Sequence, residues 1–313
     1  MISSDDLSRD QIMHIFRIAD DLKSSKVEIT IKEHAILALL FDKPSLRTRV
    51  SLEVAMAQLG GNSVYLENQM THLQSGETLS DTTRILSNYC DFIAVRTFSQ
   101  DQLVEMASVS RVPVINALTD VEHPTQALAD VYTIMQHVGR IRDAKIAFMG
   151  NVASNVANSL MITAAKLGAE VALIGPANEN PPNSLYYNKA REYSKVYTDS
   201  SVESGLEDAD IVYTDTYVDM GHIKGSDDYV QTEQERHAED RIKIFSPYQL
   251  NAKALSYAAK TALVMHDMPA HRGVEITNDV MDGPRSIVWE QAANKLLLNK
   301  AILLYLSEIG PSR

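Results

Sequence analysis

The sequence predicts an α/β protein built from two doubly wound parallel-sheet domains. Short apolar runs rich in strand-forming residues alternate with helical patterns along nearly the whole chain. Buried runs joined by helices are typical of a parallel sheet that is covered on both faces. The alternation restarts after a long helical stretch at residues 124–138, and 313 residues are enough for two hydrophobic cores.

The first half of the chain is predicted to form one domain, residues 1–132. Its first helix begins with a capping box at Ser8 and Gln11, and Ile12, Ile15 and Phe16 follow at helical spacing. Further helices are predicted at residues 49–59 and 79–89. They separate apolar strand candidates, which lie at residues 35–41, 63–66, 92–95 and 112–118.

The second domain is predicted to take residues 133–313, so the helix at 124–138 links the two domains and belongs partly to each. A helix is predicted at residues 155–167, and a polar stretch at 219–240 is interpreted as a mobile loop. The last segment, residues 286–313, is expected to form a long amphipathic helix that packs back across both domains and returns to the first. Strand candidates lie at residues 145–149, 170–174, 211–214, 242–245 and 262–265.

Composition argues against several classes of protein, including nucleic-acid-binding, membrane-spanning, secreted and metal-binding proteins. The formal net charge of −12 argues against non-specific nucleic-acid binding, which depends on Lys and Arg. No apolar run approaches the ~20 residues that cross a bilayer, and the polar, acidic N-terminus is unlike a signal or transit peptide. The single cysteine, Cys90, is expected to be a small buried hydrophobe, and a chain without disulfides fits the reducing cytoplasm. The nine histidines form no metal-binding pattern, so no metal and no other cofactor is expected.

The strongest local signal for a binding site lies at residues 41–49. A predicted strand ends there, Pro44 interrupts it, and hydroxyl and arginine side chains open a helix. The free N–H groups and the dipole of a helix N-terminus attract anions. Ser45 and Thr48 add hydroxyl donors, and the Arg47 guanidinium fits a phosphate. On spacing alone, an ordinary N-cap with surface arginines is an equal alternative, and the P-loop pattern is absent.

Two more strand ends carry polar side chains that suit an anion. Arg96 follows the strand predicted at residues 92–95, and His123 and Gln126 follow the one at 112–118. Taken singly, His123 is also compatible with a structural histidine at a helix start. Since open α/β sheets bind ligands at the carboxyl ends of their strands, the sequence predicts a shared anion pocket that contains Arg47, Arg96 and His123.

With these motifs the chain resembles the aspartate/ornithine carbamoyltransferase family, and its ornithine branch most closely. The S-x-R-T-R motif of the family stands at residues 45–49 and its HPxQ motif at 123–126. Its D-x-x-x-S-M-G loop corresponds to residues 215–221, and its H-C-L-P motif to residues 266–269. The resemblance covers nearly the whole length. It implies transfer of the carbamoyl group of carbamoyl phosphate to the side-chain amine of ornithine, which gives citrulline and phosphate in arginine biosynthesis.

The resemblance also implies roles for the matched residues. The phosphate would be held at the helix start, by Ser45, Leu46, Arg47 and Thr48. The carbamoyl group would be held by Arg96, His123, Gln126 and Lys295. His72 matches a loop that reaches into the site of a neighbouring subunit, which implies a homotrimer with shared active sites. The amine substrate would be bound by Asn155, Asp215, Asp219, Met220, Asp267 and Met268.

Chemistry agrees with these implied roles. The carbonyl oxygen of carbamoyl phosphate gains negative charge as the amine attacks, and Arg47, Arg96 and His123 would be preorganised donors for that charge. The amine attacks as its free base, and the departing phosphate can take its proton. The sequence offers no Ser-His-Asp or Cys-His arrangement for a covalent intermediate. Asp267, next to the amine, completes the set of catalytic candidates.

The sequence departs from the family pattern mainly on the amine side. Asp219 replaces the serine of the S-M-G loop, and Asp267 replaces the cysteine of H-C-L-P. Lys295 replaces an arginine and loses its planar fork, while Ala293 replaces a glutamate. Added carboxylates repel a substrate carboxylate and attract an amine. Three interpretations of the function therefore stay open. The protein carbamoylates ornithine, it carbamoylates a more cationic amine such as a diamine, or it is a catalytically weak ligand-binding relative.

Overall fold

The computed structural model describes residues 1–24, 30–43, 45–67, 77–218 and 233–309, and the chain divides into two compact units. Unit 1 comprises Met1–Tyr132 and Ala293–Arg313, and unit 2 comprises Thr133–Ala292. The two points of division fall inside helix α5 (Pro124–Val138) and helix α12 (Val288–Ile309). Each of these helices therefore supplies residues to both units.

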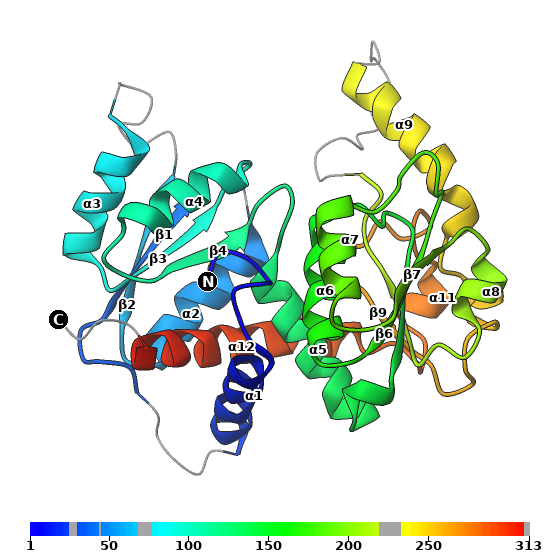
Figure 1. Cartoon of the computed structure of the whole chain (residues 1–313), viewed down its shortest axis with the longest axis horizontal. Helices are drawn as coiled ribbons and strands as arrows, with labels where there is room; N and C mark the ends of the chain where they lie inside the picture. The colour runs from blue at the N-terminus through cyan, green and yellow to red at the C-terminus, as the bar shows by residue number, and fades with distance from the viewer. Residues whose placement is uncertain (25–29, 44, 68–76, 219–232, 310–313) are drawn as a thin grey trace. The chain divides into compact units, whose positions relative to one another are not determined.

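Unit 1 contains a parallel sheet with the strand order β2-β1-β3-β4 (Figure 1). Its strands are β1 (Ile36–Phe41), β2 (Asn62–Glu67), β3 (Phe92–Arg96) and β4 (Val114–Leu118). Phe41 of β1 lies opposite Arg96 of β3, and Arg96 lies opposite Leu118 of β4. The carboxyl ends of these strands are therefore level along one edge of the sheet.

Helices cover both faces of this sheet. In Figure 1, α3 and α4 lie on one face and α2 on the other. Alternate residues of β1 and β3, such as Ala38 and Val95, pack against Leu103 and Met106 of α4. The predicted capping box of α1 is confirmed, because Ser8 and Gln11 exchange both hydrogen bonds. The helices of unit 1 include α1 (Arg9–Lys23), α2 (Leu46–Gln58), α3 (Leu79–Tyr89) and α4 (Gln100–Val109).

Unit 2 contains a second parallel sheet, with the order β7-β6-β5-β8-β9. Its strands are β5 (Lys145–Met149), β6 (Glu170–Ile174), β7 (Val196–Asp199), β8 (Ile211–Thr214) and β9 (Leu263–Met265). The chain winds outward from β5 through β6 to β7 and then returns to β8 on the other side of β5. The order therefore reverses between β5 and β8, and the carboxyl ends at such a switch point are where doubly wound sheets bind ligands.

The helices of unit 2 lie on both faces of its sheet, with α6 and α7 on one and α8 and α11 on the other (Figure 1). The second face includes Met149, Ile174 and Val264, which pack with Leu255 and Met281. The elements are η3 (Ile141–Asp143), α6 (Asn155–Lys166), α7 (Ser184–Arg191), α8 (Val202–Leu206), α9 (Glu233–Phe245), η4 (Ser246–Tyr248), α10 (Ala252–Leu255) and α11 (Asn278–Met281).

The predicted fold class of two parallel-sheet α/β domains is confirmed, but one predicted strand is wrong. Residues 242–245 form the last turn of α9 instead. Ala238, Ile242 and Phe245 recur at helical spacing and pack together against Tyr217, so a run that looked like a strand is one face of a helix. The fifth strand is β7, in which only Val196 is buried, so its apolar signal is weak.

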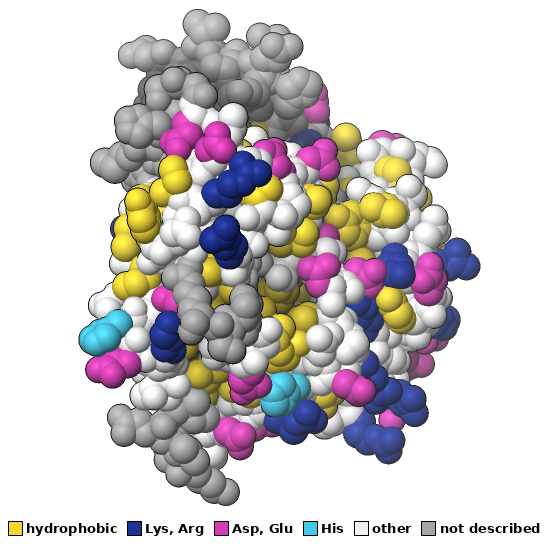
Figure 2. Space-filling view, turned by 60° about the vertical axis from the view of Figure 1, so that its left-hand side comes forward, with side chains coloured by type: hydrophobic (Ala, Val, Ile, Leu, Met, Phe, Trp, Pro, Cys, Tyr) yellow, Lys and Arg dark blue, Asp and Glu magenta, His cyan; other side chains and the backbone are white. Residues whose placement is uncertain are grey.

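The prediction of a mobile loop at residues 219–240 is wrong for residues 233–240, which belong to α9. Residues 219–232 lie outside the described part, as do Pro44 and His72. Cys90 is buried at the end of α3, as expected. Among the described residues, none of the helices combines the length and apolar character needed to cross a membrane. On the face drawn in Figure 2, hydrophobic side chains are interspersed with side chains of both charges.

Candidate active site

In unit 1, the start of α2 differs from the starts of α1, α3 and α4. Ser8, Thr78 and Ser99 each accept a capping hydrogen bond from a backbone N–H of the helix they precede. Ser45 is the N-cap residue of α2, and its side chain makes no such capping bond within the described residues. Since the first turn of a helix presents N–H groups without intrahelical acceptors, this terminus is suited to an anion.

The predicted anion-binding residues of α2 lie in this first turn. Leu46 is 74% exposed, and its apolar side chain offers no donor to an anion, so only its backbone N–H could take the predicted role. Thr48 is buried, and Arg47 lies between the two. Arg49 instead forms an ion pair with Glu53 on the same helix and stacks over the ring of Tyr65. Arg47, and not Arg49, is therefore the arginine directed to the candidate site.

The structure of unit 1 brings three cations together around His123. Arg47, Arg96 and Lys295 come from α2, the end of β3 and α12, and all three act electrostatically on the buried His123 ring. Burial, followed by the charges of Lys295, Arg96 and Arg47, holds the pKa of His123 well below its usual value. The imidazole is therefore neutral at physiological pH. The predicted grouping of Arg47, Arg96 and His123 is what the fold produces.

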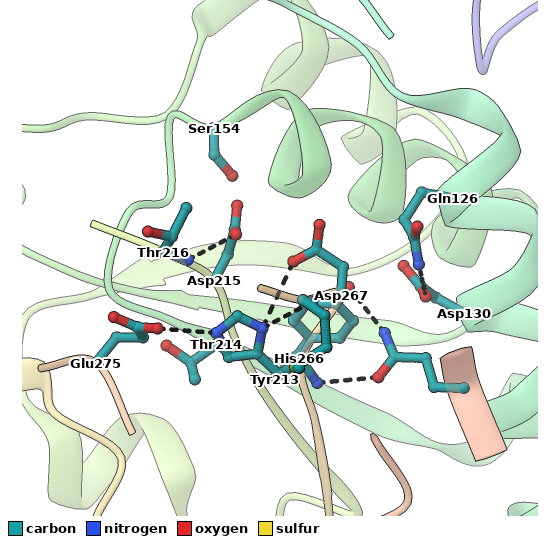
Figure 3. Close-up of polar contacts among 12 residues, drawn as sticks. Gln126, Asp130, Ser154, Tyr213, Thr214, Asp215, Thr216, His266, Asp267 and Glu275 are labelled. Atoms are coloured by element: carbon teal, nitrogen blue, oxygen red, sulfur yellow. Dashed lines mark hydrogen bonds and ion pairs between the residues drawn. The ribbon is translucent and has the colours of Figure 1, made fainter. Parts of the chain in front are cut away.

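A chain of buried hydrogen bonds runs through the same region. Lys295 Nζ donates to Gln126 Oε1 at 2.6 Å. Gln126 Nε2 donates to Asp130 Oδ1 at 2.8 Å, as Figure 3 shows. Lys295 Nζ also lies 3.4 Å from His123 Nε2. Because an ammonium group only donates, Nε2 is the acceptor and the ring proton of the neutral His123 is on Nδ1, 3.4 Å from Thr125 Oγ1.

Sequence reasoning did not identify Asp130 as part of this site. The available signal was its position four residues after Gln126 in a helical pattern, which places both side chains on one face of α5. Lys295 was identified only through the family motif, since it lies 169 residues from Gln126. The side chain of Gln126 is oriented from both ends, because its amide oxygen faces a donor and its amide nitrogen faces an acceptor.

In unit 2, polar residues gather at the carboxyl ends of β5, β8 and β9. Asp215 directly follows β8, and Asp267 lies two residues after β9. Ser154 caps α6, and Asn155 is the first residue of that helix. Figure 3 shows Ser154, Asp215 and Asp267 as members of one cluster. The sequence-predicted residues Asn155, Asp215 and Asp267 therefore all lie at the carboxyl edge of this sheet.

Asp215 has a strongly perturbed carboxyl group. Its Oδ1 accepts a 2.6 Å hydrogen bond from the N–H of Thr216. Burial raises the pKa of Asp215 to about 6, and the neighbouring Asp267, the Thr216 N–H and Ser154 offset part of that effect. The negative charge of Glu275 raises the pKa slightly further. Asp215 therefore titrates close to physiological pH.

The segment that carries Asp267 is fixed by a buried histidine. His266 Nδ1 accepts a 2.9 Å hydrogen bond from the N–H of Met268, so the ring proton is on Nε2, which donates to Glu275 Oε1 at 3.2 Å. The 3.8 Å contact between His266 Nδ1 and Asp267 Oδ1 thus joins two acceptors and is not an ion pair. Glu275 also accepts a hydrogen bond from the N–H of His271.

Two further buried residues hold the same segment from α12 and β8. The N–H of His266 donates to Gln291 Oε1 at 2.9 Å, and Gln291 Nε2 donates to the hydroxyl oxygen of Tyr213 at 3.0 Å. Sequence reasoning missed Glu275, Gln291 and Tyr213, which have no local pattern of their own. The side chain of Met268, a predicted amine-binding residue, packs against the hydrophobic core of unit 2.

Three predicted site residues, His72, Asp219 and Met220, lie outside the described residues. The other predicted residues fall into two groups. Unit 1 holds Ser45, Leu46, Arg47, Thr48, Arg96, His123, Gln126 and Lys295, and unit 2 holds Asn155, Asp215, Asp267 and Met268. The first group is cationic and suits an anion, whereas the second combines a helix N-terminus with two carboxyl groups and suits a zwitterion.

Comparison with known proteins gives a consistent result. Residues 1–136 match the carbamoyl-P binding domain of aspartate/ornithine carbamoyltransferase, and residues 142–306 match its Asp/Orn binding domain. Ornithine carbamoyltransferase of Pyrobaculum aerophilum is 40% identical over 303 residues, which cover 95% of each chain. The anabolic enzyme of Pyrococcus furiosus is 43% identical over 277 residues, which cover 87% of this chain and 83% of the relative.

Solved structures agree with the sequence comparison. An ornithine carbamoyltransferase structure from Pyrococcus furiosus has a TM-score of 0.88 and 39% identity, covering 97% of this chain and 95% of the other. The enzyme from Campylobacter jejuni has a TM-score of 0.87 and 31% identity, covering 98% of both chains. These matches cover both units and both candidate groups of site residues. The chain belongs to the aspartate/ornithine carbamoyltransferase family.

Proposed function

We propose that this protein transfers the carbamoyl group of carbamoyl phosphate to the δ-amine of ornithine, giving citrulline and phosphate. The observation that carries the proposal is the neutral His123 surrounded by Arg47, Arg96 and Lys295 at the carboxyl edge of the unit 1 sheet. Such a cluster suits a small, doubly anionic molecule that also carries a polar carbonyl group. Ornithine as the acceptor is supported by the relatives, which are named for it over nearly the whole chain.

Unit 1 supplies the binding of carbamoyl phosphate in this proposal. The first-turn N–H groups of α2, the hydroxyl groups of Ser45 and Thr48, and Arg47 hold the phosphate. Arg96 and Lys295 are donors directed to the carbonyl oxygen. Gln126 Oε1 accepts from Lys295 Nζ with one of its two lone pairs, so the second suits the carbamoyl NH2 group, while His123 Nε2 holds Lys295 beside it. Donors and acceptors are thus matched to opposite ends of the planar carbamoyl group.

Unit 2 supplies the binding of ornithine. The N-terminus of α6 with Asn155 receives the α-carboxylate, and Asp215 receives the α-ammonium group. The free δ-amine attacks the carbamoyl carbon, so that a C–N bond forms while the C–O bond to phosphate breaks. The electron pair of that bond leaves on the phosphate oxygen, and the phosphate takes the proton that the nitrogen loses. Preorganised donors at the carbonyl oxygen are the largest contribution to such a reaction.

The oligomer and the compartment are further parts of the proposal. The position of His72 in a family loop that reaches a neighbouring subunit supports a homotrimer with shared active sites. Two inactive variants, His72→Ala and Arg47→Ala, test it: mixed trimers are expected to regain activity, because some sites then combine an intact His72 with an intact Arg47. Light scattering measures the trimer directly. The single, buried Cys90 supports a cytoplasmic location.

A panel of amines tests the proposed reaction. The purified protein is assayed with carbamoyl phosphate and ornithine, lysine, putrescine or aspartate, measuring phosphate release and the mass of the carbamoylated product. We expect ornithine to give the highest kcat/KM. The extra carboxyl group of Asp267 makes putrescine the relevant competitor, and a preference for putrescine would contradict ornithine as the acceptor. Absence of phosphate release with all amines would contradict the enzymatic function.

A matched pair of arginine variants tests the phosphate site. Arg47→Ala removes a charge-assisted donor from the anion site and is expected to lower kcat/KM by about 100-fold or more. Arg111→Ala removes an exposed arginine of the same unit and is expected to leave activity unchanged. Equal activity of the two variants, with circular dichroism confirming that both are folded, would overturn the assignment of the phosphate site.

A further inference from the structure

β4, the last strand in the order of the unit 1 sheet, carries a bulge next to the candidate site. Val95 of β3 lies opposite Asn116 of β4. The next residue of β3, Arg96, lies opposite Leu118, which is two positions further along β4. β4 therefore has one residue more than β3 at this point, which is a β-bulge. The position of Arg96 against the segment that leads to His123 depends on this bulge.

The backbone of Leu118 is strained. Its φ angle is 152°, in the region of positive φ that glycine adopts freely and a residue with a bulky side chain rarely adopts. Leu118 is also the point at which β4 meets β3 again, because its carbonyl oxygen accepts a 3.0 Å hydrogen bond from the N–H of Thr97. Strained backbone of this kind persists only where its surroundings hold it in place. The bulge therefore requires a partner that holds Leu118.

The side chain of Asn116 is such a partner. Its Oδ1 accepts a 2.9 Å hydrogen bond from the N–H of Leu118. Asn116 is fully buried, and its Nδ2 donates to the carbonyl oxygen of Ile2 at 2.9 Å and to Gln100 Oε1 at 3.4 Å. The N-terminal segment that supplies Ile2 lies beside β4 (Figure 1). Both ends of the Asn116 amide are engaged, so its orientation is fixed.

The contacts continue from Asn116 towards His123. Gln100 Oε1 also accepts a 2.9 Å hydrogen bond from the hydroxyl group of Thr119. The hydroxyl oxygen of Thr119 accepts a hydrogen bond from the N–H of Glu122 at 3.1 Å, and the N–H of Thr119 donates to the carbonyl oxygen of Glu122 at 2.8 Å. These bonds close the turn that directly precedes His123. Through Gln100, Asn116 is therefore connected to the segment that carries this histidine.

We propose that Asn116 is a positioning residue for the carbamoyl end of the active site. It holds Leu118 in its strained conformation and thereby sets the position of Arg96 relative to the segment that carries His123. The inference rests on the proposed function, in which Arg96 is a donor to the carbonyl oxygen of carbamoyl phosphate. Donors that are in place before the reaction begins stabilise its transition state without reorganisation, so a side chain that holds them affects turnover.

Asn116→Ala tests the proposal, because it removes the acceptor for the N–H of Leu118. We expect kcat for citrulline formation to fall by about 10- to 100-fold, while the dissociation constant of inorganic phosphate changes by less than about twofold. The reason is that the contacts of Asn116 given above do not involve α2, which holds the phosphate. Asn88→Ala removes an exposed asparagine of α3 and is expected to behave like wild type. An equal loss of turnover and of phosphate binding would contradict the proposal, because the whole site would then be disrupted.

Leu118→Gly provides a rescue that separates positioning from packing. Glycine adopts a φ of 152° without strain, so the bulge no longer needs to be held. In the Asn116→Ala background, Leu118→Gly is therefore expected to raise kcat by about threefold. If Asn116 only fills the core or anchors Ile2, loss of the partly buried leucine side chain does not restore turnover. An unchanged or lower kcat of the double variant would overturn the proposal.

Asn116→Asp covers the case in which Asn116→Ala does not fold. It keeps an oxygen acceptor for the N–H of Leu118, so kcat is expected to stay within about threefold of wild type. Circular dichroism establishes that each variant is folded. A loss of about tenfold or more in folded Asn116→Asp would refute the role, whatever the outcome for the alanine variant. Failure of the proposed function is a separate result, because the wild type would then form no citrulline.

Discussion

Lys295 Nζ donates a 2.6 Å hydrogen bond to Oε1 of the buried Gln126. Because Asp130 accepts a hydrogen bond from Nε2 of the same amide, Gln126 has one permitted orientation. The lysine thus does two things at once: it carries charge into the anion site and holds the amide that lies beside it. Replacing an arginine fork by a single ammonium group preserves the charge but concentrates it on one atom.

Loss of the Lys295 charge is expected to damage the reaction strongly. Lys295→Met keeps a long apolar side chain but removes the donor directed to the carbonyl oxygen, so kcat/KM should fall by about 100- to 1,000-fold. Lys295→Arg, which restores the family residue, should retain activity within about tenfold. Lys300→Met on the same helix serves as the control and should behave like wild type. Equal steady-state kinetics of Lys295→Met and Lys300→Met would contradict this role.

Asp130 is predicted to be a positioning residue for Gln126. In Asp130→Asn the new side chain can present its own NH2 group to Gln126 Nε2, so the orientation of the glutamine amide is no longer fixed. We expect kcat/KM to fall by about tenfold with a smaller change in thermal stability. A double-mutant cycle with Lys295→Met measures the coupling of the two ends of the chain. Additive effects of the two substitutions on kcat/KM would contradict coupling through the Lys295–Gln126–Asp130 hydrogen bonds.

Ionisation of Asp215 is predicted to cost stability. Its pKa rises from 3.8 in the unfolded chain to about 6 in the folded one, so the folded state binds the proton more tightly. Its contribution to stability is fully present below pH 3.8 and is lost as pH rises through about 6. A shift of about 2 units corresponds to about 3 kcal/mol. The free energy of unfolding of Asp215→Asn minus that of wild type should therefore be larger at pH 8 than at pH 4 by about this amount.

Denaturant unfolding of both proteins at pH 4 and pH 8 measures that difference. Effects of the asparagine that do not depend on pH cancel when the two pH values are compared. Since this variant also loses the carboxylate proposed to bind the α-ammonium group, it should be nearly inactive at both pH values. A stability difference that is the same at both pH values would mean that Asp215 is not perturbed in the folded state.

Glu275 is predicted to matter for stability and, through the position of Asp267, for activity. Glu275→Leu leaves the buried His266 Nε2–H without its acceptor, which costs about 1–3 kcal/mol, and also removes the acceptor of the part-buried His271 N–H. Glu275→Gln keeps an acceptor oxygen and should recover most of this stability. Thermal unfolding and the KM for ornithine are the measurements. Similar melting temperatures of the two variants would show that the contacts of Glu275 contribute little.

The sequence predicted those parts of the fold and site that depend on local pattern. The alternation of apolar runs and helices indicated both sheets, and Ser45, Arg47, Arg96 and His123 were identified because each follows the end of a strand. The strand predicted at residues 242–245 failed for a related reason. A run of four residues is too short to separate a strand from one turn of a buried helix, and the contact with Ala238 decides in favour of the helix.

The remaining parts of the site depend on contacts between distant segments. Lys295 lies 172 residues from His123, and the tautomer of that histidine follows from the contact between them. The placement of Asp215 and Asp267 after neighbouring strands follows from the order of β8 and β9 in the sheet, which periodicity does not specify. Glu275 and Gln291 act through single hydrogen bonds to His266, and a single buried polar residue has no recognisable pattern.

The start of α2 has a consequence for the energetics of the whole first unit. In α1, α3 and α4 the N-cap side chain accepts a hydrogen bond from a backbone N–H of the first turn. Within the described residues, Ser45 makes no such capping bond at the start of α2. A bound phosphate would supply the missing partner, so ligand and helix would complete each other. The free energy of unfolding of unit 1 would then be lower in the ligand-free protein and would rise with the concentration of the anionic substrate.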